Sequence, residues 1–153
     1  MSAAAFDPRV LGRLRELLPE AAEEIVEGRD SIRVQLERGS LRRAMGKLVH
    51  DEILGNAVLA DLTAVSGSGP SSPFELLYAL SLPEWGCRIA LRVAVPRESS
   101  RVDSVAATWP CAEWLEREVW DLFGIGFEGH PDLRRIVLPE GFEGHPLRRE
   151  PGS

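Results

Sequence analysis

The chain has 153 residues, the usual length of one domain, and 44% of them are hydrophobic and 27% charged. This composition predicts a folded domain with a core of its own rather than a disordered segment. The formal net charge of −6 argues against a general nucleic-acid-binding protein, because such proteins present a basic patch or stripe. We therefore expect no nucleic-acid partner.

Neither a membrane span nor a signal peptide is expected. No apolar run approaches the roughly 18–20 residues that cross a bilayer, and the segment from Met1 to Val10 lacks a basic start followed by an apolar block. Any membrane contact would then come through a partner. Cys87 and Cys111 match no zinc, iron–sulfur or redox-pair spacing, so two free thiols in a reducing compartment are expected.

The first hundred residues show the order helix, two strands, helix, three strands. Asp7 and Pro8 suit the N-cap and first position of a helix that Pro19 ends. Residues 25–26 and 32–36 predict a hairpin, and Ser40 is expected to cap a second helix that reaches about Leu54. Strands are expected at residues 57–65, 74–81 and 88–95, with the first two joined by a flexible loop. The predicted fold is α+β, a single layer of mostly antiparallel sheet with helices on one face.

Two further helices are expected after this sheet, a short one from Asp103 to near Trp109 and a longer one from Pro110 to Phe123. On a helical wheel the longer helix has an apolar arc that should face the core, formed by Ala112, Leu115, Val119, Leu122 and Phe123. Its opposite arc carries Glu113, Arg117 and Asp121 at i, i+4 and i+8. At that spacing Arg117 could pair with carboxylates on both sides.

Two residues break the pattern of this helix. Glu116 falls in the apolar sector, where a carboxylate is costly unless it finds a cation or several N–H donors. Trp114 falls among the charged residues, where a large aromatic side chain is typical of a binding anchor. The alternative is that Glu116 extends to solvent from the start of the helix and Trp114 lies flat on its own domain. Two broken rules on one helix favour a functional surface.

An imperfect repeat follows Gly124. The run from Phe127 to Pro131 recurs as the run from Phe142 to Pro146, and each copy leads into Leu-Arg-Arg, at residues 133–135 and 147–149. Glycine permits sharp turns, proline fixes the chain direction, and arginine pairs bidentately with carboxylates. We therefore divide the chain into an α+β domain at residues 1–123 and an extended docking arm of the same domain at residues 124–153.

Catalytic and metal sites are not expected in this chain. His130 and His145, with Glu128, Asp132 and Glu143, are possible metal ligands, but no HExxH or cysteine-rich spacing accompanies them. Each histidine precedes a proline on a turn, where its ring could equally bind backbone groups. A small free-standing metalloenzyme using the two histidines stays an alternative that metal analysis would test.

A family resemblance rests on the same residues. The runs EREVWDLFGI at residues 116–125 and FEGHPDLRRI at residues 127–136 resemble the hallmark of the 30 kDa subunit family of respiratory complex I, the NADH-quinone oxidoreductase of bacteria. Residues 143–149 are similar to the closing motif of this family, and residues 60–65 and 74–78 are similar to its strands. Weaker similarity extends over nearly all of the chain.

The resemblance implies a subunit in the peripheral arm of a membrane-associated, proton-translocating NADH-quinone oxidoreductase, on the cytoplasmic side of the inner (plasma) membrane. Such a subunit holds no cofactor of its own, and flavin and iron–sulfur clusters lie in partner subunits. It docks the 49 kDa-type subunit, near the iron–sulfur subunits. The alternative is the equivalent subunit of a membrane-bound nickel–iron hydrogenase, because the residues after Val65 and Arg149 depart from the family pattern.

The same resemblance, with the broken helix pattern, gives the expected interface. Ion pairs of Glu116, Arg117, Glu118 and Asp121 are expected to fix the last helix, and the arm around the two histidines is expected to bind the neighbouring subunit. The predicted interface residues are Trp114, Glu116, Arg117, Glu118, Asp121, His130, Asp132, Arg134, Arg135, His145, Leu147, Arg148 and Arg149.

Overall fold

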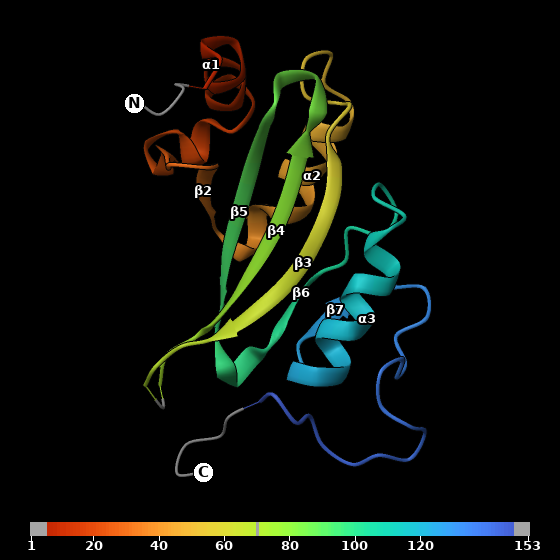
Figure 1. The fold of residues 1–153 in the computed structure, drawn as a ribbon. Coiled ribbons are helices and arrows are strands. Elements are labelled where there is room, and N and C mark those ends of the chain that lie inside the picture. The colour runs from red at the N-terminus through yellow and green to blue at the C-terminus, as the bar shows by residue number, and fades with distance from the viewer. Residues whose placement is uncertain (1–5, 70, 149–153) are drawn as a thin grey trace.

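The computed structural model describes residues 6–69 and 71–148 (Figure 1). The helices are α1 (Pro8–Leu17), α2 (Leu41–Val49) and α3 (Ala112–Phe123), with short 3-10 turns η1 (Pro19–Glu24), η2 (Arg38–Ser40), η3 (Pro83–Trp85) and η4 (Arg97–Ser99). The strands are β1 (Ile25–Glu27), β2 (Ile32–Leu36), β3 (Val58–Ser66), β4 (Phe74–Leu82), β5 (Cys87–Val95), β6 (Arg101–Asp103) and β7 (Gly126–Glu128).

The main sheet has five strands in the order β1-β2-β5-β4-β3. The predicted hairpins are confirmed, because β1 pairs with β2, β3 with β4, and β4 with β5, all antiparallel. The fourth pairing, between β2 and β5, is parallel and was not expected. It places β2, from the first part of the chain, beside the central strand β5.

Side chains alternate in burial along the two central strands. In β4 and β5 the buried positions include Phe74, Tyr78, Leu91 and Val95, and the positions between them are half-buried or exposed. The buried positions join one hydrophobic core with residues of the three helices. Figure 1 shows α2 behind β4 and β5. The α+β class predicted from the sequence is therefore confirmed.

The ends of the first two helices follow from local hydrogen bonds. The carboxylate of Asp7 accepts from the N–H of Arg9 and caps α1, as the sequence predicts. The second helix ends at Val49, earlier than expected, and the hydroxyl of Ser40 makes no capping bond. Asp51 explains the early end, because its carboxylate accepts from the N–H groups of Ile53 and Leu54 and holds a turn in place of another helical turn.

The prediction of a short helix from Asp103 to Trp109 is wrong. Residues up to Asp103 form β6, which pairs in parallel with β7, and the N–H of Ser104 donates to the carbonyl of Glu128. Pairing with β7 overrides the helix N-cap signal of Asp103 and Ser104, because β7 accepts from backbone N–H groups that the first turn of a helix would leave unpaired. The arm that was expected to be extended from residue 124 onward therefore contains a short strand, β7, near its beginning. Among the described residues, no helix is long and apolar enough to cross a bilayer.

Candidate functional site

The candidate site is helix α3 together with residues 129–148, which we call the return segment because it folds back along this helix (Figure 1). The helix spans twelve residues and ends at Gly124, whose φ of 72° is left-handed. Return-segment residues contact α3 near its start, at its middle and at its end. Much of the predicted interface therefore lies where these two parts of the chain meet.

Glu116 is fully buried, as its position on the helical wheel indicates, and it has found donors. The hydroxyl of Ser104 donates to its Oε2 at 2.6 Å, and the N–H of Val105 donates to its Oε1 at 2.8 Å. Burial raises the pKa of Glu116, although both hydrogen bonds act in the opposite direction. The alternative in which this side chain extends to solvent is wrong. Sequence patterns did not single out Ser104 as its partner, because the link to Glu116 depends on the turn after β6.

His130 anchors the beginning of the return segment to α3. Its side chain is fully buried, its Nδ1 accepts from the N–H of Asp132, and its Nε2 lies 2.9 Å from the carbonyl oxygen of Glu113. A carbonyl only accepts, so these partners assign the ring proton to Nε2. The same nitrogen lies 4.0 Å from Oε2 of Glu116. The ring thus ties the turn at residue 130 to the first part of the helix.

The middle of α3 does not present the predicted exposed charged arc. Arg117 and Asp121 are buried, and the guanidinium of Arg117 donates to the carbonyls of Arg134 and Arg135 rather than to carboxylates. The ion pairs predicted for Arg117 are therefore wrong. The helical wheel placed these residues correctly opposite the apolar arc, but the return segment covers that side and buries it.

Asp121 holds the middle of the return segment through four donors. Its Oδ2 accepts from the successive N–H groups of Ile136, Val137 and Leu138, and its Oδ1 accepts from Arg135 at 2.6 Å. Burial alone would raise the pKa of Asp121, but these donors outweigh it and lower the pKa to about 2. A buried carboxylate is normally costly, and here it is paired and hydrogen-bonded.

The end of the return segment binds the last carbonyls of α3. A helix leaves its final four carbonyl groups without intrahelical donors. Gly124 donates to Trp120, the Nδ1 of His145 lies 2.9 Å from the oxygen of Asp121, the N–H of Leu147 donates to Leu122, and Arg148 donates to Phe123. All four carbonyls therefore have partners, three of them from residues 145–148.

Arg148 also joins this helix end to the rest of the fold. Its Nη2 donates to the carbonyl of Arg97 at 3.0 Å and to the hydroxyl of Ser100 at 3.1 Å, and its guanidinium lies 5.1 Å from the ring centre of Phe74. Arg135 plays a similar part in the middle of the segment, because it also donates to the carbonyl of Gly144. Arg135 and Arg148 were both predicted to be interface residues, and both bind groups of this chain itself.

The remaining predicted interface residues point outward. Trp114 is exposed, with the guanidinium of Arg117 5.1 Å from its ring centre. Glu118 is exposed on α3. Asp132 and Arg134 form an exposed ion pair at 2.8 Å, and Leu147 is exposed. Arg149 lies outside the described residues.

Two exposed residues of the return segment were missed by sequence reasoning. Val137 is exposed between the two copies of the repeat. Phe142 is exposed too, whereas its counterpart Phe127 is buried in β7. The repeat in the sequence therefore does not mean equivalent environments. The signal that could have found Phe142 is the absence of any strand-like run around the second copy.

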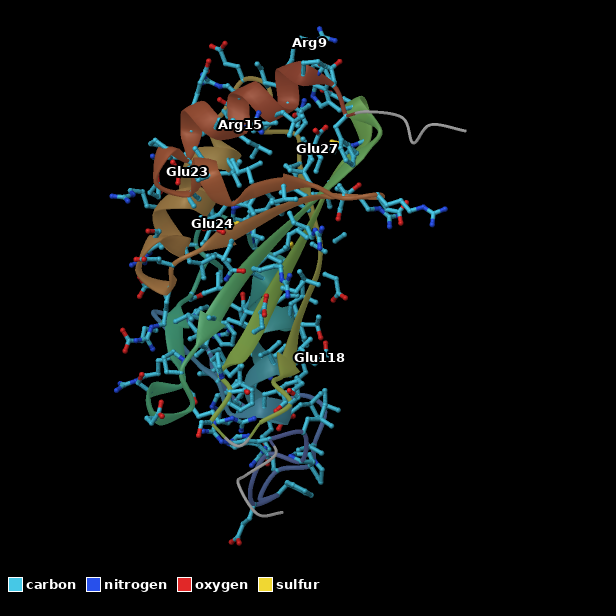
Figure 2. All side chains as sticks on the ribbon, turned by 90° about the vertical axis from the view of Figure 1, so that its left-hand side faces the viewer. Arg9, Arg15, Glu23, Glu24, Glu27 and Glu118 are labelled. Atoms are coloured by element: carbon cyan, nitrogen blue, oxygen red, sulfur yellow. The ribbon has the colours of Figure 1, made fainter. Side chains whose placement is uncertain are left out.

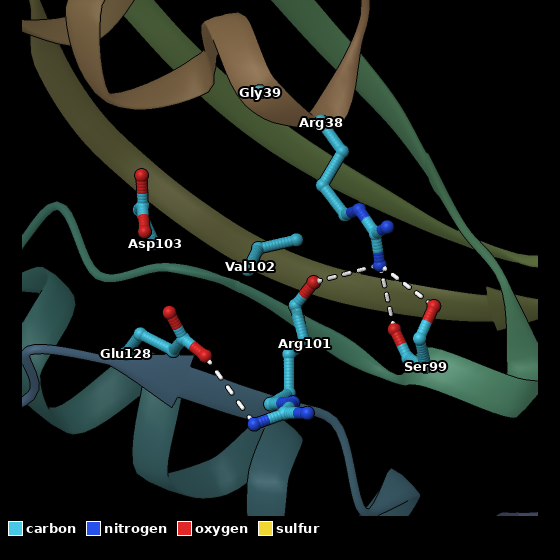
Figure 3. Close-up of a pocket in the computed structure, with 7 residues that line it drawn as sticks. All are labelled: Arg38, Gly39, Ser99, Arg101, Val102, Asp103 and Glu128. Carbon is cyan, nitrogen blue, oxygen red and sulfur yellow. Dashed lines mark hydrogen bonds and ion pairs between the residues drawn. The ribbon is translucent and has the colours of Figure 1, made fainter.

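The two histidines are not brought together as ligands of one ion. The ring of His130 binds near the start of α3 and the ring of His145 near its end. Within the described ranges, no group of three or more histidine, cysteine or acidic side chains is placed to hold a metal. A hollow of about 320 Å³ beside β6 and β7 is lined by both signs of charge, including Arg38, Asp103 and Glu128 (Figure 3). Arg38 there donates to backbone carbonyls, so it holds β6 in place.

Residues 34–151 match the family described as the 30 kDa subunit of the respiratory-chain NADH dehydrogenase. The chain belongs to this family. The predicted motifs at residues 116–136 and 143–149 lie inside the matched region, so the resemblance seen in the sequence is confirmed.

Similar proteins carry names that agree with this family. NADH-quinone oxidoreductase subunit 5 of Thermus thermophilus is 45% identical over 113 residues, covering 68% of this chain and 55% of that protein. The C/D subunit of the NADH-quinone oxidoreductase of Gluconacetobacter diazotrophicus is 36% identical over 149 residues, 92% of this chain and 25% of that protein. The chain thus spans about half, or less, of the curated relatives it matches.

Two solved structures share the fold. One, described as the trypsin-resistant fragment of Nqo5, has a TM-score of 0.63 and 37% identity, and the match covers 82% of this chain and 98% of the fragment. The other belongs to a membrane-bound sulfane sulfur reductase, an archaeal respiratory membrane complex, with a TM-score of 0.74 at 24% identity over 86% of this chain and 75% of that one. At that identity the second match concerns the fold alone.

Proposed function

We propose that the chain is a subunit of a membrane-associated, proton-translocating NADH-quinone oxidoreductase, that it holds no cofactor, and that it docks the 49 kDa-type subunit through the outer side of α3 and the return segment. It would lie in the peripheral arm on the cytoplasmic side of the membrane. Electron transfer would then take place in partner subunits that carry flavin and iron–sulfur clusters. Family membership and the names of the relatives support this role.

The observation that carries the docking surface is the distribution of exposed apolar side chains. Seven large hydrophobic residues of the described part of the chain are 41–62% exposed, and four of them lie on α3 or the return segment: Trp114, Val137, Phe142 and Leu147. Aromatic side chains on a rigid surface are typical of interface anchors. The internal hydrogen bonds of Asp121 and Arg135 hold the return segment in one shape before any partner binds, which lowers the entropic cost of docking.

The test replaces two aromatic anchors whose side chains stack on Arg117 and Arg135 but make none of the hydrogen bonds that hold the return segment. Trp114→Ser with Phe142→Ser should lower the amount of 49 kDa-type subunit that co-purifies with the tagged chain at least tenfold, because a central aromatic anchor contributes about 2 kcal/mol or more. The melting temperature of the isolated variant should change little, since both side chains are exposed.

A matched control carries the same number of changes on a distant surface. Arg15 and Glu23 lie at the α1 end of the molecule, away from the return segment (Figure 2), so Arg15→Ser with Glu23→Ser should leave co-purification unchanged. If the aromatic double variant also recovers the partner in full, this docking surface is wrong. Reversing the charge at Arg148 is unsuitable as a test, because that residue also binds the end of α3.

A further inference from the structure

A second exposed apolar surface lies on the main sheet. The three remaining exposed large hydrophobic residues of the described ranges are Val26, Val58 and Val65. Directly paired residues point to the same side of a sheet. The valines pair with Arg33, Ser81 and Glu75, all of which alternate with core positions. All three therefore lie on the face of the sheet that does not build the core, from β1 at one edge to β3 at the other.

Three arginines surround a small residue at the middle of this open face. Ala90 lies in β5, with Arg88 and Arg92 two residues away on either side and Arg33 opposite it on β2. Arg92 forms an ion pair with Glu75. Within residues 6–69 and 71–148, neither Arg33 nor Arg88 takes part in an ion pair. Asp61 lies on the same face near the β3 edge, because it pairs with Ala79, so the strand residues of this face carry three arginines against two carboxylates in a chain whose net charge is −6.

The surface is hollowed at the same place. A depression of about 340 Å³ crosses four strands and combines apolar with charged side chains; it is lined by Ser31, Arg33, Val65, Glu75, Leu77, Ala90 and Arg92. Ala90 of this lining pairs directly with Ala79 on β4, so no large side chain fills the sheet surface there. A carboxylate in the depression would meet Arg33, which has no ion pair within the described residues, and Arg88 lies two residues along β5 from Ala90.

We propose that the open face of the main sheet is a second docking surface, occupied by a segment of a partner subunit that carries a carboxylate side chain beside apolar ones. The proposal rests on the proposed function, since it adds a second contact between this chain and the same complex. A second copy of this chain is disfavoured, because a two-fold interface would set the arginines of one copy against those of the other. A small free acid would leave the three valines uncovered.

A photo-crosslinking residue at Val65 tests the proposal in the intact complex. Benzoylphenylalanine at this exposed position should crosslink to one partner subunit, and the crosslinked peptide should contain an aspartate or glutamate next to apolar residues. Crosslinking to a second copy of this chain, to lipid or to an acid-free peptide overturns the proposal. The control carries the same group at Arg15, at the far end of the molecule (Figure 2), where no specific product is expected.

Charge reversal tests the role of the arginines. Arg33→Glu with Arg88→Glu should lower the Val65 crosslink at least tenfold, whereas Arg15→Glu with Arg43→Glu, an equal change of charge at exposed positions of α1 and α2, should not. Equal yields from both pairs overturn the proposal. Failure of the proposed function looks different, because the unchanged chain would then co-purify with no subunit of the oxidoreductase. Partners that co-purify while Val65 crosslinks to none of them overturn the sheet surface alone.

Discussion

Asp121 shows how one side chain fixes the position of a long segment. Its carboxylate is fully buried and accepts from three consecutive backbone N–H groups and from Arg135. An isolated buried charge would destabilise the fold, yet this one supplies acceptors for donors that belong to no helix or strand. The return segment can therefore be ordered although, in the described part of the chain, no helix or strand extends beyond residue 128.

The depressed pKa of Asp121 predicts a pH-dependent stability. Its pKa is 3.8 in the unfolded chain and about 2 in the fold, so its contribution is fully present above pH 4 and is lost as the pH falls towards 2. The shift corresponds to about 2 kcal/mol. Asp121→Asn should be less stable than the unchanged chain at pH 7 by about 3 kcal/mol.

The measurement is urea unfolding of both proteins from pH 7 to pH 2. The difference in their free energies of unfolding should shrink by about 2 kcal/mol below pH 4. A difference that stays constant over this range would contradict the assignment. Exposed Asp132→Asn is the control, and its effect should stay within about 0.5 kcal/mol at every pH.

At the scale of elements, the stability of α3 depends on the part of the chain that follows it. Residues 145–148 bind the last carbonyl groups of this helix, so their close approach to the helix end stabilises α3 as much as its apolar arc does. Gly124 permits this approach. A Cβ added there would lie 2.8 Å from the ring of His145, and the φ of 72° already disfavours side chains.

Gly124→Ala should therefore destabilise the chain by about 3 kcal/mol, combining left-handed strain of about 1 kcal/mol with displacement of His145 from the carbonyl it binds. Gly86→Ala is the matched control, because its φ of 58° is also left-handed but nothing lies within 4 Å of the added Cβ. That variant should lose only about 1 kcal/mol. Chemical denaturation of both proteins gives the comparison, and equal losses would show that the His145 contact contributes nothing.

At the scale of the whole molecule, contacts between residues distant in sequence connect an early strand and the end of the return segment to β5 and the turn that follows it. Strand β2 pairs with β5, and Arg148 donates to Arg97 just after β5. We therefore expect the return segment and the sheet to unfold in one transition. Fluorine labels on Trp85 and Trp120 should report the same urea midpoint, whereas an earlier midpoint at Trp120 would mean that the return segment detaches by itself.

Sequence patterns predicted correctly those features that depend on residues close together in the chain. The strands with alternating burial, the Asp7 cap and the buried position of Glu116 all follow from spacing along one element. The parallel pairing of β2 with β5 could not be predicted in this way, because β2 fits any neighbour with an apolar inner face. Arg117 and Asp121 were placed on an exposed arc for the same reason, since a helical wheel contains no information about a segment that returns to cover it.

The position of β2 has a consequence for synthesis on the ribosome. This strand ends at residue 36, and the neighbour that completes its pairing begins at residue 87. At a translation rate of about 5–20 residues per second, the wait for that neighbour lasts roughly 3–10 s. During that interval the only strand paired with β2 is the three-residue β1, so the other edge of β2 has no strand partner. We therefore expect the sheet to close only after β5 has been synthesised.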